Sequence, residues 1–120
     1  FATIIDACVN QKLDLVNIEW SNEKSLCIVL CSKGYPDDYK KNLEINNLNK
    51  IDLDNNDFIF HAGTKEKNSK IYSNGGRVLN FVVKSKEFRI SRERAINLIN
   101  KINWENGFYR KDIGFKVIDE

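Results

Sequence analysis

Residues 70–103 carry the pattern that most constrains the fold. Two strand-length runs flank Asn74-Gly75, and the second run, residues 77–85, places apolar side chains on both of its faces. Asn-Gly is the strongest short-range signal for a type I′ hairpin turn, so we expect the two runs to pair through it. An apolar stripe at helical spacing then predicts a helix over residues 88–103, the longest in the chain. This order predicts an α+β domain with a small, mainly antiparallel sheet.

The remaining segments predict shorter elements around this unit. A short helix is expected over residues 4–11, and strands over 16–20, 26–31 and 58–61. The strands at 16–20 and 26–31 are expected to form a hairpin, and the continuous apolar run of the second predicts cover on both faces. Pro36 is expected to begin a second short helix. Residues 42–57 predict loops with an edge strand around Ile51, residues 64–69 a polar turn, and residues 104–119 a loop with a short strand.

Length and charge exclude several classes of protein. The chain has 120 residues, which suits a single domain over residues 1–120, and its net charge of +2 is too small to indicate a nucleic-acid or membrane partner. No apolar run approaches the roughly 20 residues that span a bilayer, and no secretory signal is visible, so we expect a cytoplasmic location. Because the chain begins at Phe1 and contains no Met, we expect it to be a piece of a longer polypeptide.

The cysteines do not indicate a metal or redox site. Cys8, Cys27 and Cys31 are odd in number and fit no zinc or dithiol spacing. Cys27 and Cys31 share a face if the segment is a strand. We therefore expect buried free thiols that act as small apolar side chains, in preference to metal ligands or nucleophiles.

Three segments place glycine beside a cationic or hydrogen-bonding residue: residues 60–65, 73–79 and 108–114. Backbone can approach an anion closely at glycine, and a guanidinium can hold an anion through two hydrogen bonds. Each segment also has a purely structural interpretation. A hairpin alone explains Asn74-Gly75 with Arg77 as a solvated charge, His61 is compatible with a structural role at a strand end, and Arg110 and Asp112 suit a surface ion pair. From the residues alone we identify no catalytic residue and no metal site.

Five ordered blocks resemble the C-terminal domain of the phosphoribosylamine–glycine ligase family, also called glycinamide ribonucleotide synthetase. The blocks span nearly the whole chain: Leu13-Asp14 with Glu19-Trp20; Gly34-Tyr35-Pro36 with Tyr39; residues 60–64; residues 74–79; and residues 109–114. Residues 43–57 depart from the family pattern and are expected to form an exposed variable loop. Asn42 stands where the family usually has glycine, and Asn tolerates left-handed backbone best among the other residues. Lys33 replaces a residue that is often small.

The resemblance implies a barrel-sandwich-like domain with one long and one or two short helices, packed on upstream ATP-grasp domains of the same protein. The family uses ATP with Mg²⁺ or Mn²⁺ to activate glycine as an acyl phosphate, which the amine of 5-phosphoribosylamine attacks. The products are glycinamide ribonucleotide, ADP and phosphate, in purine biosynthesis. The ATP and metal ligands of such enzymes lie mainly upstream, so this piece alone is expected to be inactive.

The resemblance also implies roles for particular residues. Asn74, Gly75, Gly76 and Arg77 are expected to bind the substrate phosphate, with His61, Gly63 and Thr64 nearby. Arg110 and Asp112 are further candidates that lie near the substrate or brace the domain. Two alternatives remain open: a small anion- or RNA-binding module that uses the lysines at positions 65, 67 and 70 with Arg110-Lys111, and the equivalent domain of a different ATP-grasp ligase.

Overall fold

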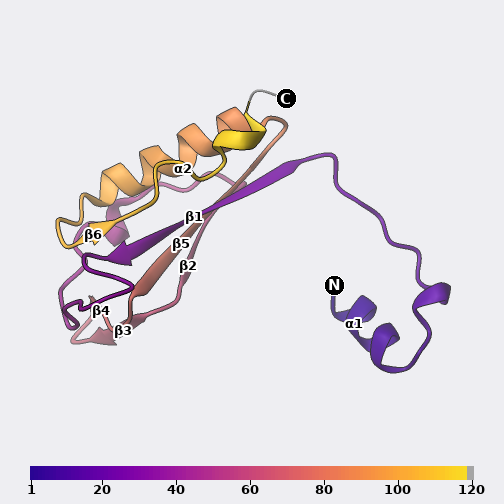
Figure 1. Cartoon of the computed structure of the whole chain (residues 1–120), viewed down its shortest axis with the longest axis horizontal. Helices are drawn as coiled ribbons and strands as arrows, with labels where there is room; N and C mark the ends of the chain where they lie inside the picture. Colours follow the sequence, from indigo (N-terminus) through magenta and orange to yellow (C-terminus); the bar gives the residue numbers. More distant parts are fainter. Residues whose placement is uncertain (119–120) are drawn as a thin grey trace.

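The computed structural model describes residues 1–118 and has an α+β architecture with antiparallel sheets (Figure 1). The helices are α1 (Ala2–Val9) and α2 (Phe88–Ile102), and short 3₁₀ turns cover Leu13–Leu15, Leu48–Lys50 and Phe115–Val117. The strands are β1 (Lys24–Ser32), β2 (Asp57–His61), β3 (Thr64–Lys67), β4 (Lys70–Ser73), β5 (Arg77–Ser85) and β6 (Gly107–Phe108). The predicted fold class, the long helix and the strand at 58–61 are confirmed. Residue 119, included in the predicted C-terminal loop, lies outside the described residues.

One face of the main sheet carries the core. The strand order is β2-β5-β1-β6, and α2 lies across one face (Figure 1). Register pairs Ile28 of β1 with Phe81 of β5, so alternate side chains of both strands point toward α2. The buried cluster joins the two strands to the helix through Leu26, Ile28, Leu30, Leu79, Phe81, Val83, Ala95, Leu98 and Ile99.

The prediction of a hairpin at Asn74-Gly75 is wrong. β4 pairs with β3, whereas β5 pairs with β1 and β2, so Asn74-Gly75 connects two different sheets. The two-residue hairpin turn is Asn68-Ser69, with φ of 52° and 59°, and the expected polar turn at residues 64–69 is mostly β3. Asn is among the residues that tolerate these positive φ values, so Asn68 supplies the turn chemistry that the sequence analysis placed at Asn74.

The predicted strand at residues 16–20 and its hairpin are also wrong. β6 pairs with β1 only at Cys31 and Ser32, and the segment before β1 does not fold back along the rest of that edge. Residues 16–22 are extended and leave the body of the molecule toward α1 (Figure 1). The predicted helix at 4–11 is confirmed, although it begins at Ala2 and ends at Val9.

β1 is covered on one face and not on both. Leu26, Ile28 and Leu30 are buried, but Cys27 is exposed and Cys31 is only half-buried, because α2 packs on a single side of the sheet. The expectation of buried thiols therefore fails for Cys27, and Cys8 is exposed as well.

Two loops differ from their predicted form. The segment from Pro36 makes turns in place of a helix, beginning where the Tyr35 amide donates to the Ser32 carbonyl. Residues 42–57 contain no strand at Ile51, but they are not an exposed loop, since Ile45 is buried in the core and the Trp104 indole donates to the Glu44 carbonyl.

Asn42 behaves as expected of a residue that replaces glycine. Its φ is 62°, in the left-handed region, and its amide donates to the Ser73 carbonyl at 2.7 Å. The turn is therefore kept, and it directs the following segment along β4.

Candidate functional site

A hollow of about 540 Å³ opens on the face of the sheet opposite α2, and we call it the Arg77 hollow. Val29 and Asn80, which face each other across β1 and β5, lie at its base. They alternate with core residues that point toward α2, which places the hollow on the other face of the sheet. The complete lining is Val29, Tyr35, Tyr39, Ala62, Gly63, Gly76, Arg77 and Asn80.

Gly63 joins the two segments that form one wall of the Arg77 hollow. Its amide donates to the Arg77 carbonyl at 2.8 Å, and its carbonyl accepts from the Asn74 amide at 2.7 Å. A Cβ at Gly63 would lie 2.5 Å from the Arg77 carbonyl oxygen and 2.8 Å from the Gly75 Cα. Only glycine allows the two backbones to lie this close together, and Gly63 therefore lies against residues 74–77.

Tyr35 forms the opposite wall and packs directly over Gly76. A Cβ at Gly76 would lie 2.0 Å from Cδ2 of the Tyr35 ring, so the ring occupies the space that a side chain would need. Tyr39 meets the Tyr35 ring edge-on, with 6.0 Å between ring centroids and an interplanar angle of 64°. Gly76 thus leaves room for the Tyr35 ring.

Ser32 fixes the segment that leads into Arg77. Its amide donates to the Gly76 carbonyl at 2.8 Å, and its hydroxyl donates to the Gly75 carbonyl at 2.9 Å. Ser32 itself is buried at the end of β1. The carbonyls of Gly75 and Gly76 thus accept hydrogen bonds from Ser32. The adjoining Arg77 side chain supplies the positive charge at the hollow.

Arg77 has an exposed side chain that forms no hydrogen bond or ion pair with any residue in the described part of the chain. A register shift between Leu30 and Cys31 pairs Arg77 with Cys31. Burial raises the pKa of the Cys31 thiol, and the Arg77 charge acts in the opposite direction. A guanidinium beside an amide and two phenols is a set of donors suited to an anion with several oxygens.

His61, Thr64 and Asn74 lie beside the Arg77 hollow but do not line it. The His61 Nδ1 and Thr64 Oγ1 atoms are 2.8 Å apart and form a hydrogen bond across the β2–β3 turn. His61 and Asn74 are both exposed. This hydrogen bond to Thr64 is consistent with a structural role for His61, while the His61 ring remains accessible.

Arg110 and Asp112 are bonded to each other and are not part of the Arg77 hollow. Arg110 Nε donates to Asp112 Oδ1 at 3.0 Å, and this hydrogen bond lowers the pKa of the Asp112 carboxyl. Arg92 of α2 donates to the carbonyls of Lys111 and Ile113, which holds the segment near the helix. The pair itself is an exposed ion pair between residues two positions apart.

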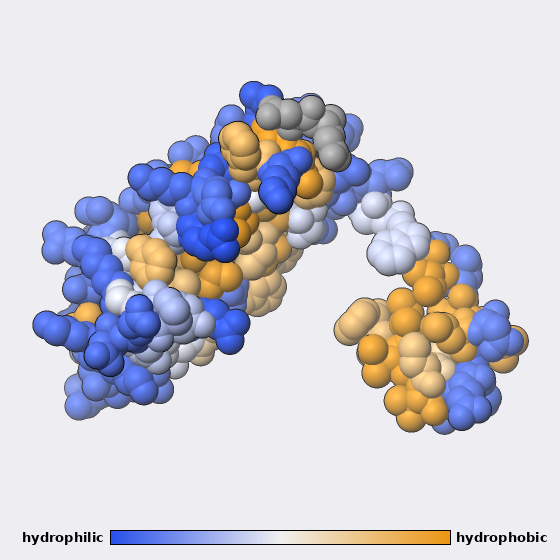
Figure 2. All heavy atoms as spheres, viewed as in Figure 1, coloured by the Kyte–Doolittle hydropathy of each residue, from blue (hydrophilic) through white to orange (hydrophobic). Residues whose placement is uncertain are grey.

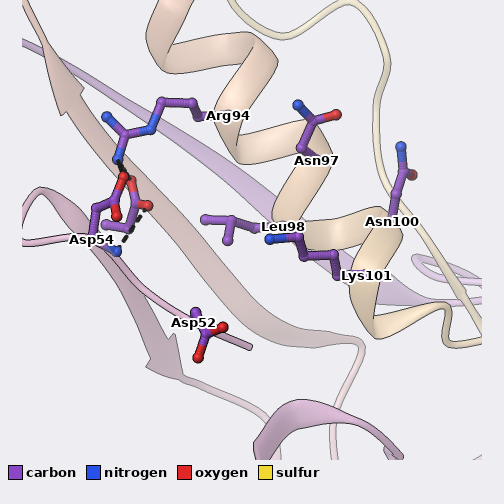
Figure 3. Close-up of a pocket in the computed structure, with 8 residues that line it drawn as sticks. Asp52, Asp54, Arg94, Asn97, Leu98, Asn100 and Lys101 are labelled. Atoms are coloured by element: carbon purple, nitrogen blue, oxygen red, sulfur yellow. Dashed lines mark hydrogen bonds and ion pairs between the residues drawn. The ribbon is translucent and has the colours of Figure 1, made fainter. Parts of the chain in front are cut away.

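A second hollow, of about 600 Å³, contains an arginine whose charge is already paired, and we call it the Arg94 hollow (Figure 3). Arg94 on α2 donates to Asp57 at 2.7 Å and to Asp54 at 2.8 Å. The Asp57 side chain is only 5% exposed and also accepts from the Asp54 amide at 3.2 Å. Asp52, Asn97, Leu98, Asn100 and Lys101 complete the lining.

The side chains that surround Arg77 and the carboxylates that pair with Arg94 had no signal in the sequence. Tyr35 and Tyr39 were present in a block that carries the family resemblance, but nothing in their spacing indicated that they wall the Arg77 hollow. Asn80 sits at an alternate position of a strand and had no signal of its own. The link from Arg94 to Asp57 spans 37 residues, so only the packed fold brings these two together.

Comparison with known proteins places the chain in a family. Residues 25–116 match the family model described as the C domain of phosphoribosylglycinamide synthetase. A phosphoribosylamine–glycine ligase of Caldanaerobacter subterraneus is 41% identical over 113 residues, covering 94% of this chain and 26% of that protein. A bifunctional purine biosynthetic protein of Dictyostelium discoideum is 40% identical over 117 residues, covering 97% of this chain and 14% of its own length.

Comparison of the fold with solved structures supports the same family. The crystal structure of phosphoribosylamine–glycine ligase from Thermotoga maritima superposes with a TM-score of 0.67 at 31% identity, covering 91% of this chain and 27% of that one. The chain thus spans about a quarter of the length of most of the relatives it matches. By sequence and by fold, the chain belongs to the phosphoribosylglycinamide synthetase family, of which it is a C domain.

Proposed function

We propose that this chain is the C-terminal domain of a longer ATP-dependent ligase that joins glycine to 5-phosphoribosylamine, and that the Arg77 hollow binds the phosphate of the second substrate. The observation that carries the assignment is the state of Arg77, a cation held at a structured hollow with no internal anion to neutralise it. Among the described residues, Arg94 and Arg110 each have a carboxylate partner. A substrate phosphate would supply the missing anion.

In this proposal the residues of the domain bind and orient the substrate. Arg77 donates charge-assisted hydrogen bonds to phosphate oxygens, while Gly75 and Gly76 keep side chains away from the approach. The Tyr35 ring and the Asn80 amide limit where the ribose lies. His61, Thr64 and Asn74 lie at the rim, and Arg110 with Asp112 braces the C-terminal segment.

ATP and Mg²⁺ or Mn²⁺ are assigned to the preceding part of the polypeptide. In residues 1–118 no group of three or more His, Cys, Asp or Glu side chains is placed to hold a metal ion. The domain packs on the preceding part, and without it the domain is expected to be inactive.

A cytoplasmic location is part of the same proposal. Cys8, Cys27 and Cys31 are free thiols, which is typical of proteins in a reducing compartment. No helix in the described residues has the length and apolarity needed to cross a bilayer. The alternative of an RNA-binding module is not favoured by the family match, and Lys70, one of its candidate lysines, is paired with Glu44 at 3.0 Å.

The first experiment measures ADP release by the longer parent protein with glycine and 5-phosphoribosylamine each present or omitted. We expect release that requires both substrates. Release with another acid in place of glycine would indicate a different ATP-grasp ligase, and a folded parent that releases no ADP would contradict the proposed reaction.

The second experiment tests the phosphate assignment by Arg77→Ala in that parent. Losing charge-assisted hydrogen bonds to phosphate is expected to raise the KM for 5-phosphoribosylamine roughly 10- to 100-fold, with the KM for ATP nearly unchanged. Arg110→Ala is the matched control, because it removes an arginine outside the hollow. Equal effects of Arg77→Ala on both substrates would exclude a specific phosphate contact.

A further inference from the structure

The first 22 residues form an arm that projects from the body of the domain (Figure 1). Within the arm, α1 packs against the turn Leu13–Leu15. The other helices and strands pack mainly against one another. The radius of gyration is 17.1 Å, whereas a compact domain of this length has about 14 Å. The arm is thus a separate small unit attached to the sheet through an extended segment.

The arm exposes many apolar side chains to solvent, which is unfavourable in water. Of the eight residues of α1, only Thr3 and Asp6 are polar, and Val9 is 77% exposed. Beyond the helix, Leu15 is 76% and Trp20 87% exposed, and the apolar residues of the arm gather on one visible surface (Figure 2). A helix that is apolar nearly all round is normally buried, and α1 is far too short to cross a membrane.

The helix also lacks the means to persist alone. An isolated helix shorter than about 12 residues is marginal in water. Within this chain α1 has eight residues. Its persistence as a helix therefore requires packing against something outside the described contacts.

The similar proteins indicate which part of the polypeptide α1 packs against. The C-domain family model begins at residue 25, so it excludes the arm. The chloroplastic phosphoribosylamine–glycine ligase of Arabidopsis thaliana nevertheless matches 98% of this chain, which leaves about two residues unmatched and includes nearly all of the arm. The matched region is 22% of that protein, so most of the relative lies outside it. The arm is thus shared with whole ligases but is not part of the C-domain core.

We propose that the arm docks into an apolar groove on the preceding part of the same longer polypeptide, so that it is an element of that part's core and ties the C domain to it. This proposal rests on the proposed function, in that the chain continues a longer ligase. The groove accepts the exposed apolar side chains Ile5, Val9 and Leu15, while the extended residues 16–22 lead from it to β1. The structural boundary of the C domain then falls near residue 24.

Hydrogen–deuterium exchange tests the docking. In the 120-residue chain, the amides of residues 5–9 are expected to exchange nearly as fast as in an unstructured peptide. In the longer parent protein, docking is expected to slow their exchange by a factor on the order of 100. Equally fast exchange in both proteins would overturn the proposal, as would protection in the 120-residue chain that increases with its concentration, which would identify a second copy as the occupant.

A pair of variants locates the surface. Val9→Asp in the parent is expected to return the arm amides to fast exchange, whereas Lys12→Asp, on an exposed polar residue of the same arm, is expected to retain their protection. If Val9→Asp prevents the parent from folding, Val9→Ser gives the same comparison with a smaller change, and protection as strong as in the wild type would contradict the proposal.

ADP release measured on the same wild-type parent separates the two proposals. Release that requires both substrates, with an unprotected arm, refutes the docking and leaves the ligase activity standing. A protected arm in a folded parent that releases no ADP supports the docking and refutes the ligase activity.

Discussion

The Arg77 hollow and the Arg94 hollow have similar volumes and each contains an arginine. Carboxylates pair with Arg94, whereas no carboxylate pairs with Arg77 in the described residues. Arg94 reaches from α2 to Asp57 and Asp54, and the nearly buried Asp57 carboxylate depends on it. Arg77 is held by backbone hydrogen bonds around its carbonyl, while its guanidinium remains open to solvent. A paired charge joins two elements of the fold, whereas an unpaired charge at a shaped hollow is available to a ligand.

The two hollows also differ in what surrounds the arginine. Acidic side chains, Asp52 among them, line the Arg94 hollow, which disfavours binding of an anion there. The Arg77 hollow is lined by aromatic, amide and small residues with no carboxylate. Hollow size therefore says little about ligand binding in this protein, and the local balance of charge says more.

The largest expected difference between the two hollows is in stability. Arg94→Ala would leave the Asp57 carboxylate buried with a single amide donor, so we expect the free energy of unfolding to fall by about 2–3 kcal/mol. Arg77→Ala, its matched control, removes an exposed side chain without a partner and is expected to change it by less than about 0.5 kcal/mol. Urea unfolding of the 120-residue chain measures both. A large loss for Arg77→Ala would show that its charge is structural after all.

A smaller effect is expected at the wall of the Arg77 hollow. Gly76→Ala would place Cβ 2.0 Å from the Tyr35 ring, so the ring must move, at a cost of about 1–2 kcal/mol in unfolding free energy. The altered wall is expected to raise the KM of the parent for 5-phosphoribosylamine. Gly75→Ala is the control, since its nearest contact is 3.1 Å, to Gly63 Cα. Equal destabilisation by both variants would indicate that the Tyr35 packing contributes little.

The smallest effect is expected at the exposed pair of Arg110 and Asp112, which belongs to neither hollow. The hydrogen bond from Arg110 lowers the pKa of Asp112 in the folded protein. A lowered pKa means that the stabilising contribution is present above the ordinary carboxyl pKa and is lost as the pH falls through the folded value. Because both side chains are exposed, we expect only a slight change in stability for Arg110→Ala.

A carboxyl NMR titration of Asp112 measures this pair directly. Arg110→Ala is expected to return the pKa of Asp112 upward toward its ordinary value, and Lys111→Ala, the neighbouring control, is expected to leave it lowered. An Asp112 titration that is the same in the wild type and in Arg110→Ala would mean that the ion pair does not persist in solution.

Sequence periodicity by itself determined the elements that bury an apolar face. β5 and α2 were predicted to within one residue, because alternation and the 3.6-residue stripe are properties of consecutive side chains. β2 was also predicted to within one residue, and α1 to within two, although α1 exposes its apolar side chains in this chain. The five ordered blocks also led to the family, and that resemblance drew attention to Arg77.

Tertiary structure alone decided how these elements meet. Asn74-Gly75 and Asn68-Ser69 are both plausible hairpin turns, and the choice depended on which strands pair, which is set by the core that β5 shares with β1 and β2. The alternation at residues 16–20 was typical of a strand, but a strand needs a partner, and this segment leads away from β1 toward α1. Tyr35 over Gly76, and Arg94 beside Asp57, join residues some 40 positions apart. Such contacts follow from packing in three dimensions, which no local pattern of residues records.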